Sequence, residues 1–156
     1  MGDNHINYRV AGILLRNNKI LLQKPTNDAS FAVPGGQAKF GETGAQTLSR
    51  RFKEETNIDI TVGDLKWVEE VFFVWDDKPQ HIICHYYDIA LQNETQLPNE
   101  DSFISDEYIE GRNFQLKFHW IPLDDLEKIK VYPVNIADLM KRYREGIQYF
   151  VNRENI

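Results

Sequence analysis

The stretch from Pro34 to Asn57, PGGQAKFGETGAQTLSRRFKEETN, constrains the fold of this chain more than any other part. Two glycines follow a proline, so the short apolar strand predicted over residues 31–36 must be broken by a turn. Glu42 stands at or just before the start of a predicted helix, where free N–H groups favour a carboxylate. The sequence therefore places a glycine turn against the beginning of a helix.

The predicted helix has one apolar and one polar side. At about 100° per residue, Ala45, Leu48 and Phe52 share a side that we expect to face the core. The polar side carries, at spacings of three and four residues, Thr47, Arg51, Glu54 and Glu55. This side is either a solvated face with weak ion pairs or a site for a hard cation such as Mg²⁺. The nearby glycines suit the cation because no Cβ keeps the backbone away from it.

The rest of the chain alternates predicted strands and helices, which indicates an α/β or α+β fold. We expect strands over residues 8–16, 19–24, 65–77, 80–91 and 114–123, loops over 25–30 and 92–113, a short helix over 124–129 and a longer amphipathic helix over 135–151. Asn17 and Asn18 form the predicted first turn, and DDKP, residues 76–79, the tip of a long hairpin.

The length, net charge and cysteine content of the chain limit the classes of function that it can have. A chain of 156 residues predicts one domain, residues 1–156. The net charge of −6 and the absence of a basic run argue against a nucleic-acid or anionic-membrane surface, although a local basic pocket stays possible. No secretory signal and no bilayer-spanning apolar run is visible. Cys84 is the single cysteine, so no internal disulfide forms, which fits a cytoplasmic location.

The spacing of the central stretch resembles the Nudix box. The matching positions are Gly36, Glu42, Arg50, Phe52, Glu54, Glu55 and Ile58. The segments KILLQK, FAVPGG and HWIPLDDLEKIKVYP are also similar to parts of Nudix hydrolases outside the box, so the resemblance covers most of the chain. It implies an α/β Nudix fold, a mixed β-sheet sandwiched between helices.

The same resemblance implies a metal site and a reaction. Glu54 and Glu55 match the metal-binding glutamates, the carbonyl of Gly36 a backbone ligand, and Glu42 a supporting carboxylate, with Mg²⁺ or Mn²⁺ as cofactor. Arg50 matches the arginine of the catalytic core. The implied activity is metal-dependent hydrolysis of a diphosphate bond in a nucleoside triphosphate or an ADP-ribose-like compound. The alternative is a catalytically weakened protein that binds or senses a nucleotide without turnover.

Three positions depart from the family pattern. Arg51 stands where the family has a glutamate that its arginine orients, so Arg50 is expected to lack that partner. Lys39 stands where relatives often have Glu. Arg51 and Lys39 together make the local charge more positive by about four units, which should weaken the binding of a second metal ion. Asn57 stands where the family has glycine, and this is the mildest replacement, since Asn also adopts the left-handed conformation that ends helices.

We expect Arg51 to cost activity rather than supply it, because it pairs with Glu54 and Glu55 when no ligand is bound and its positive charge competes with the cation. The change Arg51→Glu is expected to raise metal affinity and turnover if the arginine merely competes with the cation. If Arg51 and Lys39 instead hold phosphate oxygens, the same change slows the reaction.

Several further residues are candidates for the site. His119 near the family's late glutamate position, or Glu107 or Glu110 in the acidic loop, could serve as general base. Arg9, Lys24 and Phe31 are candidate substrate contacts, with Phe73, Trp75 and Tyr86 as further aromatic candidates. His81 and His85 around Cys84 do not have a zinc-site spacing. The helix predicted over 135–151 is a candidate surface for a homodimer.

Overall fold

The computed structural model describes residues 4–94, 102–104 and 115–154 of the chain. The elements in chain order are β1 (Ile6–Arg16), β2 (Lys19–Pro25), β3 (Phe31–Ala32), β4 (Gly35–Gln37), α1 (Gly44–Thr56), β5 (Ile60–Trp75), β6 (Lys78–Leu91), β7 (Ser102–Ile104), β8 (Leu116–Pro122), the 3₁₀ helix η2 (Leu123–Lys128), β9 (Val131–Tyr132), α2 (Ile136–Lys141) and β10 (Gln148–Arg153).

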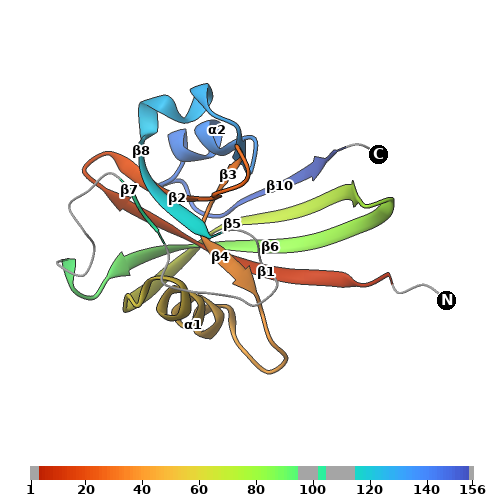
Figure 1. Ribbon diagram of the computed structural model, residues 1–156, viewed down its shortest axis with the longest axis horizontal. Helices are drawn as coiled ribbons and strands as arrows, with labels where there is room; N and C mark the ends of the chain where they lie inside the picture. Colours follow the sequence, from red (N-terminus) through yellow and green to blue (C-terminus); the bar gives the residue numbers. More distant parts are fainter. Residues whose placement is uncertain (1–3, 95–101, 105–114, 155–156) are drawn as a thin grey trace.

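The strands form one mixed sheet that is organised around β1. Strand β1 pairs in parallel with β6 from Ile6 to Leu14, and its last residues pair antiparallel with β2. The order through the sheet is β10-β5-β6-β1-β2-β3-β9, while β4 pairs with β1 and β8 with β2. Helix α1 lies on one side of the sheet, and α2 with η2 on the other (Figure 1). The predicted mixed sheet between helices is confirmed.

Both predicted hairpin turns are confirmed, and both use residues with positive φ. Asn17 and Asn18 have φ values of 53° and 60° between β1 and β2. Asp76 and Asp77, with φ values of 50° and 59°, join β5 to β6. Two-residue turns of this kind match the right-handed twist of the strands, and Asn and Asp tolerate them better than other side chains do.

The helix predicted over 135–151 is confirmed over Ile136–Lys141 and wrong beyond Lys141. Helix α2 ends at Lys141, and Gly146, with φ of 90°, redirects the chain into β10. β10 pairs in parallel with β5. Its side chains alternate, with Tyr149 and Val151 exposed and Phe150 packed against the core. Pairing with β5 decided residues 148–153 over their local helical pattern, so the helix that was a candidate dimer surface extends only over Ile136–Lys141.

The loop predicted over 92–113 is also wrong in part, because it contains β7. This strand pairs with β8, and Phe103 stacks on Phe118 with ring centroids 5.1 Å apart. Glu107 and Glu110, two candidate bases, lie outside the described residues. None of the described helices is both long and apolar enough to cross a bilayer.

Two buried clusters, one on each side of the sheet, hold the fold together. The α1-side core includes Val10, Leu14, Leu21, Leu48, Phe52, Phe118 and Trp120. The α2-side core includes Ala11, Ile13, Ile20, Leu22, Trp67, Tyr86, Ile136 and Leu139. Alternate residues of β1, β2 and β8 belong to opposite clusters, so one face of each strand packs on the α1 side and the other face packs on the α2 side.

The buried side of α1 differs from the predicted one by one position. Leu48 and Phe52 are buried as expected, but Ala45 is exposed. Gly44 is buried instead, since a Cβ there would lie 2.8 Å from the hydroxyl oxygen of Tyr87. The side that packs on the sheet therefore follows the i, i+4 row that starts at Gly44.

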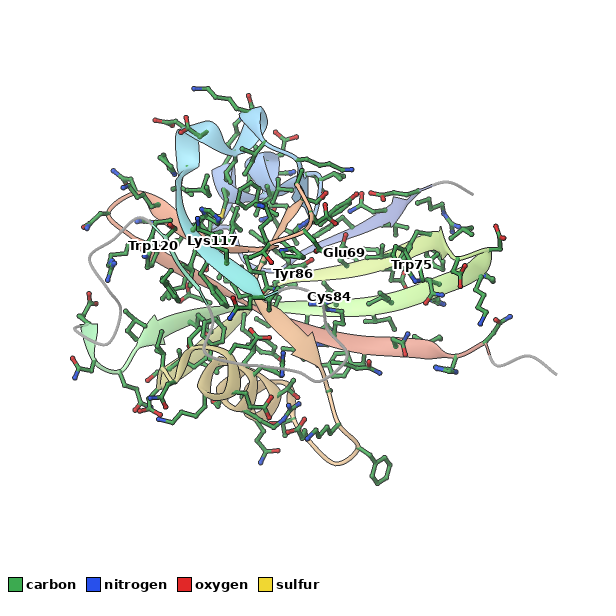
Figure 2. The ribbon with its side chains drawn as sticks, viewed as in Figure 1. Glu69, Trp75, Cys84, Tyr86, Lys117 and Trp120 are labelled. Atoms are coloured by element: carbon green, nitrogen blue, oxygen red, sulfur yellow. The ribbon has the colours of Figure 1, made fainter. Side chains whose placement is uncertain are left out.

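A buried polar group lies on the α2 side of the sheet. Glu69 on β5 accepts hydrogen bonds from Tyr86 (2.7 Å) and Asn152 (2.6 Å). Burial raises the pKa of Glu69, and it raises the pKa of the Cys84 thiol to about 12. Figure 2 shows Glu69, Cys84 and Tyr86 together on the neighbouring strands β5 and β6. The hydrogen bond from Tyr86 joins β6 to β5, and the one from Asn152 joins β10 to β5. Glu69 therefore has a structural role.

Candidate functional site

The start of α1 is fixed by its own side chains. The hydroxyl of Thr43 accepts a hydrogen bond from the backbone N–H of Gln46 (3.1 Å), and the Gln46 side chain accepts one from the N–H of Thr43 (2.9 Å). This capping box satisfies two N–H groups that the first turn would leave open. Glu42 therefore lies just before the helix, as predicted.

Glu42 is the partner of Arg50. The guanidinium donates from Nε to Oε2 (2.7 Å) and from a terminal nitrogen to Oε1 (3.0 Å) of Glu42. Arg50 also donates to Glu54 (3.2 Å). The hydrogen bonds from Arg50 and from the Lys39 N–H lower the pKa of Glu42 to about 2. Arg50 lacks the family's glutamate at position 51, as expected, and Glu42 and Glu54 are its carboxylate partners instead.

Arg51 lies between the carboxylates of α1 and the glycine turn. One terminal nitrogen donates to Glu54 (2.6 Å), and the other donates to Glu55. A Cβ at Gly36 would lie 2.7 Å from Nε and 2.8 Å from Cγ of Arg51. A side chain at position 36 would force Arg51 to move from this place, so the glycine lets the guanidinium lie against the turn. The predicted pairing of Arg51 with both carboxylates is present.

The two neighbouring carboxylates differ in their surroundings. Glu55 is 2% exposed, whereas the Glu54 side chain is 38% exposed. Burial raises the pKa of Glu54, but hydrogen bonds from Arg51 and Arg50 outweigh it, so the pKa is lowered. A buried carboxylate is costly without an opposite charge. The polar side of α1 is thus not a solvated face at Glu55.

A cavity of about 630 Å³ opens beside these residues. Among the described residues, four cationic side chains line this cavity: Arg9, Lys39, Arg50 and Arg51. Glu55 is the carboxylate among these lining residues. The chain as a whole carries a charge of −6, so this concentration of positive charge is local. A cavity of this size and charge suits an anionic small molecule such as a diphosphate.

Three candidate residues lie away from the cavity lining. His119 pairs with Leu22 of β2, so it lies on the opposite face of β8 from Phe118 and α1. Its ring meets Phe31 edge-on at 5.2 Å. Burial, with Lys117 and Lys24 nearby, lowers the pKa of His119. The structure does not bring His119, Phe31 or Lys24 to the carboxylates of α1.

The aromatic candidates are also placed elsewhere. Tyr86 is buried against Glu69, and Trp75 is 71% exposed at the end of β5, beside the hairpin turn. Figure 2 shows Trp75 toward the far end of the β5–β6 hairpin. Phe73 is absent from the residues that line the cavity.

Gln23 is a cavity residue that sequence reasoning missed. It lines the cavity, is 9% exposed, and its Oε1 has no hydrogen-bond partner among the described residues. Its charged neighbour Lys24 is the residue that the sequence predicts as a substrate contact, but the Lys24 Nζ donates to the Asp28 carbonyl (2.7 Å). The alternation of β2 puts Gln23 with Leu21 on the α1 side, and that alternation is the signal that could have found it.

The oxygen atoms near α1 are of the type that binds a hard divalent ion, but arginine side chains pair with the carboxylates among them. Glu42, Glu54, Glu55 and the Gly36 carbonyl are the donor types that Mg²⁺ and Mn²⁺ prefer. In the part of the chain that the structure describes, no three acidic, histidine or cysteine groups converge as a metal site. Arg50 and Arg51 engage those carboxylates instead.

Comparisons with known proteins agree with this architecture. A sequence profile described as the NUDIX domain matches residues 7–143. Over 52 residues the chain is 44% identical to an ADP-ribose pyrophosphatase of Methanocaldococcus jannaschii, a match that covers 31% of each protein. The chain thus matches under a third of that relative's length.

Solved structures share the fold. A UDP-X diphosphatase superposes with a TM-score of 0.64 at 16% identity, over 97% of this chain and 69% of that one. A MutT protein from Methanosarcina mazei superposes with a TM-score of 0.61 at 17% identity, over 93% of this chain and 97% of that one. At these identities the likeness establishes the fold alone.

Proposed function

This chain belongs to the NUDIX family, and on that premise we propose that it hydrolyses a diphosphate bond in a nucleoside diphosphate linked to another group. The substrate class comprises nucleoside triphosphates and ADP-ribose-like compounds. The observation that carries the proposal is the cavity in which Arg9, Lys39 and Arg51 adjoin the buried carboxylate of Glu55. The names of two relatives, an ADP-ribose pyrophosphatase and a UDP-X diphosphatase, support the same class.

The proposed cofactor is Mg²⁺ or Mn²⁺, held by Glu54, Glu55 and the carbonyl of Gly36. When bound, such an ion supplies Lewis-acid polarisation of phosphate oxygens and a more acidic water. Glu42 supports the site through Arg50, which donates to both Glu42 and Glu54.

The cationic side chains would hold the substrate. Arg9 and Lys39 line the cavity and would neutralise the charge of a diphosphate that lies along it. Hydrolysis requires that charge to be balanced while water attacks a phosphorus atom. His119 is not part of this proposal because it faces the other side of β8.

A second candidate function is nucleotide binding without turnover. The observation that favours it is the pairing of Arg51 with both Glu54 and Glu55. If that pairing persists with a ligand bound, the carboxylates stay unavailable to a cation and the protein acts as a binder.

One experiment separates the two functions. The protein is incubated with ADP-ribose, UDP-sugars, and ribo- and deoxyribonucleoside triphosphates in Mg²⁺, Mn²⁺ or EDTA, and the products are separated by chromatography. The products to follow are AMP and ribose phosphate from ADP-ribose, UMP and sugar phosphate from UDP-sugars, and phosphate or pyrophosphate from the triphosphates. Hydrolysis should require the divalent ion, vanish in EDTA and be strongly reduced in Glu55→Gln. A nucleotide that raises the melting temperature with no product over hours across the panel would favour the binder.

A further inference from the structure

We propose that Arg51 is an exchangeable counterion that couples metal binding to the binding of a diphosphate. In the ligand-free protein its guanidinium neutralises Glu54 and Glu55. When a diphosphate enters the cavity, the guanidinium turns to the phosphate oxygens and leaves both carboxylates to a divalent ion. This inference rests on the proposed function, because it assigns to the same carboxylates the role of metal ligands.

The first step is that Arg51 and a cation exclude each other. Arg51 donates to Glu54 at 2.6 Å and also to Glu55, so its positive charge already occupies the space between these carboxylates. The same side chain lies against Gly36, whose carbonyl is the proposed backbone ligand. A divalent ion beside the guanidinium would meet its full positive charge at short range.

The second step is that the buried carboxylate needs one partner or the other. Glu55 is 2% exposed, and a carboxylate at such depth is stable only with an opposite charge nearby. Either Arg51 or a metal ion satisfies this need. The exchange therefore replaces one positive charge with another, and Glu55 is never left unpaired.

The third step is that a diphosphate offers Arg51 an alternative anionic partner. Arg51 lines the cavity, and its side chain is 15% exposed, so part of it faces the space that a ligand would fill. A guanidinium forms paired, charge-assisted hydrogen bonds with phosphate oxygens. Lys39 and Arg9 line the same cavity and would bring the phosphates within reach of Arg51.

The exchange makes a prediction that no simple salt bridge makes. If Arg51 competes with the metal but assists the anion, its removal must change the two affinities in opposite directions. Metal alone should bind more tightly, and the anion should bind the metal-loaded protein more weakly. The two ligands should also help each other less in the variant, because the shared arginine is gone.

The test measures each ligand separately in the full chain and in Arg51→Gln. Calorimetry with Mn²⁺ alone should give an affinity about fivefold or more tighter in the variant. Calorimetry with a methylene-bridged, non-hydrolysable analogue of ADP-ribose in saturating Mn²⁺ should give an affinity about fivefold or more weaker, because the bound ion then neutralises Glu55 and frees Arg51 for the phosphates. Lys53→Gln is the matched control, because it removes one positive charge from the exposed side of the same helix, where Lys53 pairs with Asp59. It should leave both affinities unchanged.

Other outcomes overturn the inference. Unchanged affinities for both ligands would mean that the Arg51 ion pairs have no effect on ligand binding. A fall in both affinities would mean that Arg51 only supports the fold. If Arg51→Gln does not fold, Arg51→Lys, which keeps the charge but loses the fork, should show both changes at smaller size. Failure of the proposed function looks different: Mn²⁺ would then bind equally to the native chain, Arg51→Gln and Glu55→Gln.

Discussion

Arg50 reaches back eight residues to hold both carboxylate oxygens of Glu42, at 2.7 and 3.0 Å. Glu42 also accepts a hydrogen bond from the Lys39 N–H at 2.8 Å, and Arg50 donates to the Gln37 carbonyl at 3.3 Å. The turn between β4 and α1 is thereby tied to the middle of the helix. The arginine of the box holds this turn in place, although its usual neighbouring glutamate is replaced by Arg51.

This pairing predicts an acid-dependent contribution to stability. The pKa of Glu42 is lowered from 4.5 to about 2, so the folded state favours the carboxylate. Its contribution is complete above pH 4.5 and is lost as the pH falls from 4.5 toward 2. Glu42→Gln should be less stable than the native chain at pH 7, with a difference that shrinks across this window.

Urea unfolding of both proteins at several pH values from 7 to about 2.5 checks the sign. A difference that stays constant or grows as the pH falls would contradict the assignment of the pKa shift to the Arg50 pair. Glu127→Gln is the control, since that side chain is 70% exposed and pairs only distantly with Lys141, at 3.7 Å.

Glu55→Gln should weaken Mn²⁺ binding about tenfold or more, because it removes the negative charge of the buried carboxylate that we propose as a metal ligand. Calorimetry measures the affinity, and thermal unfolding in saturating Mn²⁺ gives a second readout, since a ligand of the folded state raises the melting temperature. Equal Mn²⁺ affinity in the native chain and the variant would remove Glu55 from the metal site.

Gln23→Leu should raise KM for the substrate about fivefold while leaving the fold intact. The Gln23 amide lines the cavity with its Oε1 unpartnered among the described residues, and a lost hydrogen bond of this kind costs about 1 kcal/mol. Lys24→Met is the matched control on the same strand, because Lys24 turns to the Asp28 carbonyl. Equal KM values for the two variants would place the substrate away from Gln23.

Asn57→Ala should lower the free energy of unfolding by about 1 kcal/mol, and Asn57→Gly should stay within about 0.5 kcal/mol of the native chain. Asn57 ends α1 with φ of 59°, in the left-handed region that alanine adopts at a cost. Urea unfolding compares the three proteins. A neutral Asn57→Ala would show that the helix end relaxes out of this conformation.

The sequence by itself determined the features that depend on short stretches of chain. The Asn17–Asn18 turn, the end of α1 at Asn57 and the pairing of Arg51 with Glu54 follow from local backbone preference and helical spacing. The spacing from Gly36 to Glu55 led to the family that the sequence profile supports. Such features need no knowledge of what packs against them.

The tertiary structure decided everything that depends on which segments meet. Pairing with β5 made a strand of residues 148–153, where the local pattern also suited a helix. The pairing of β2 with β8 put Gln23 on the cavity side and His119 on the opposite face, and a shift of one residue would have put both on the same face. The close approach of Arg51 to Gly36 joins a helix to a strand that lies before it in the sequence. Strand register and packing are set by the burial of the whole sheet, so no short stretch of sequence contains them.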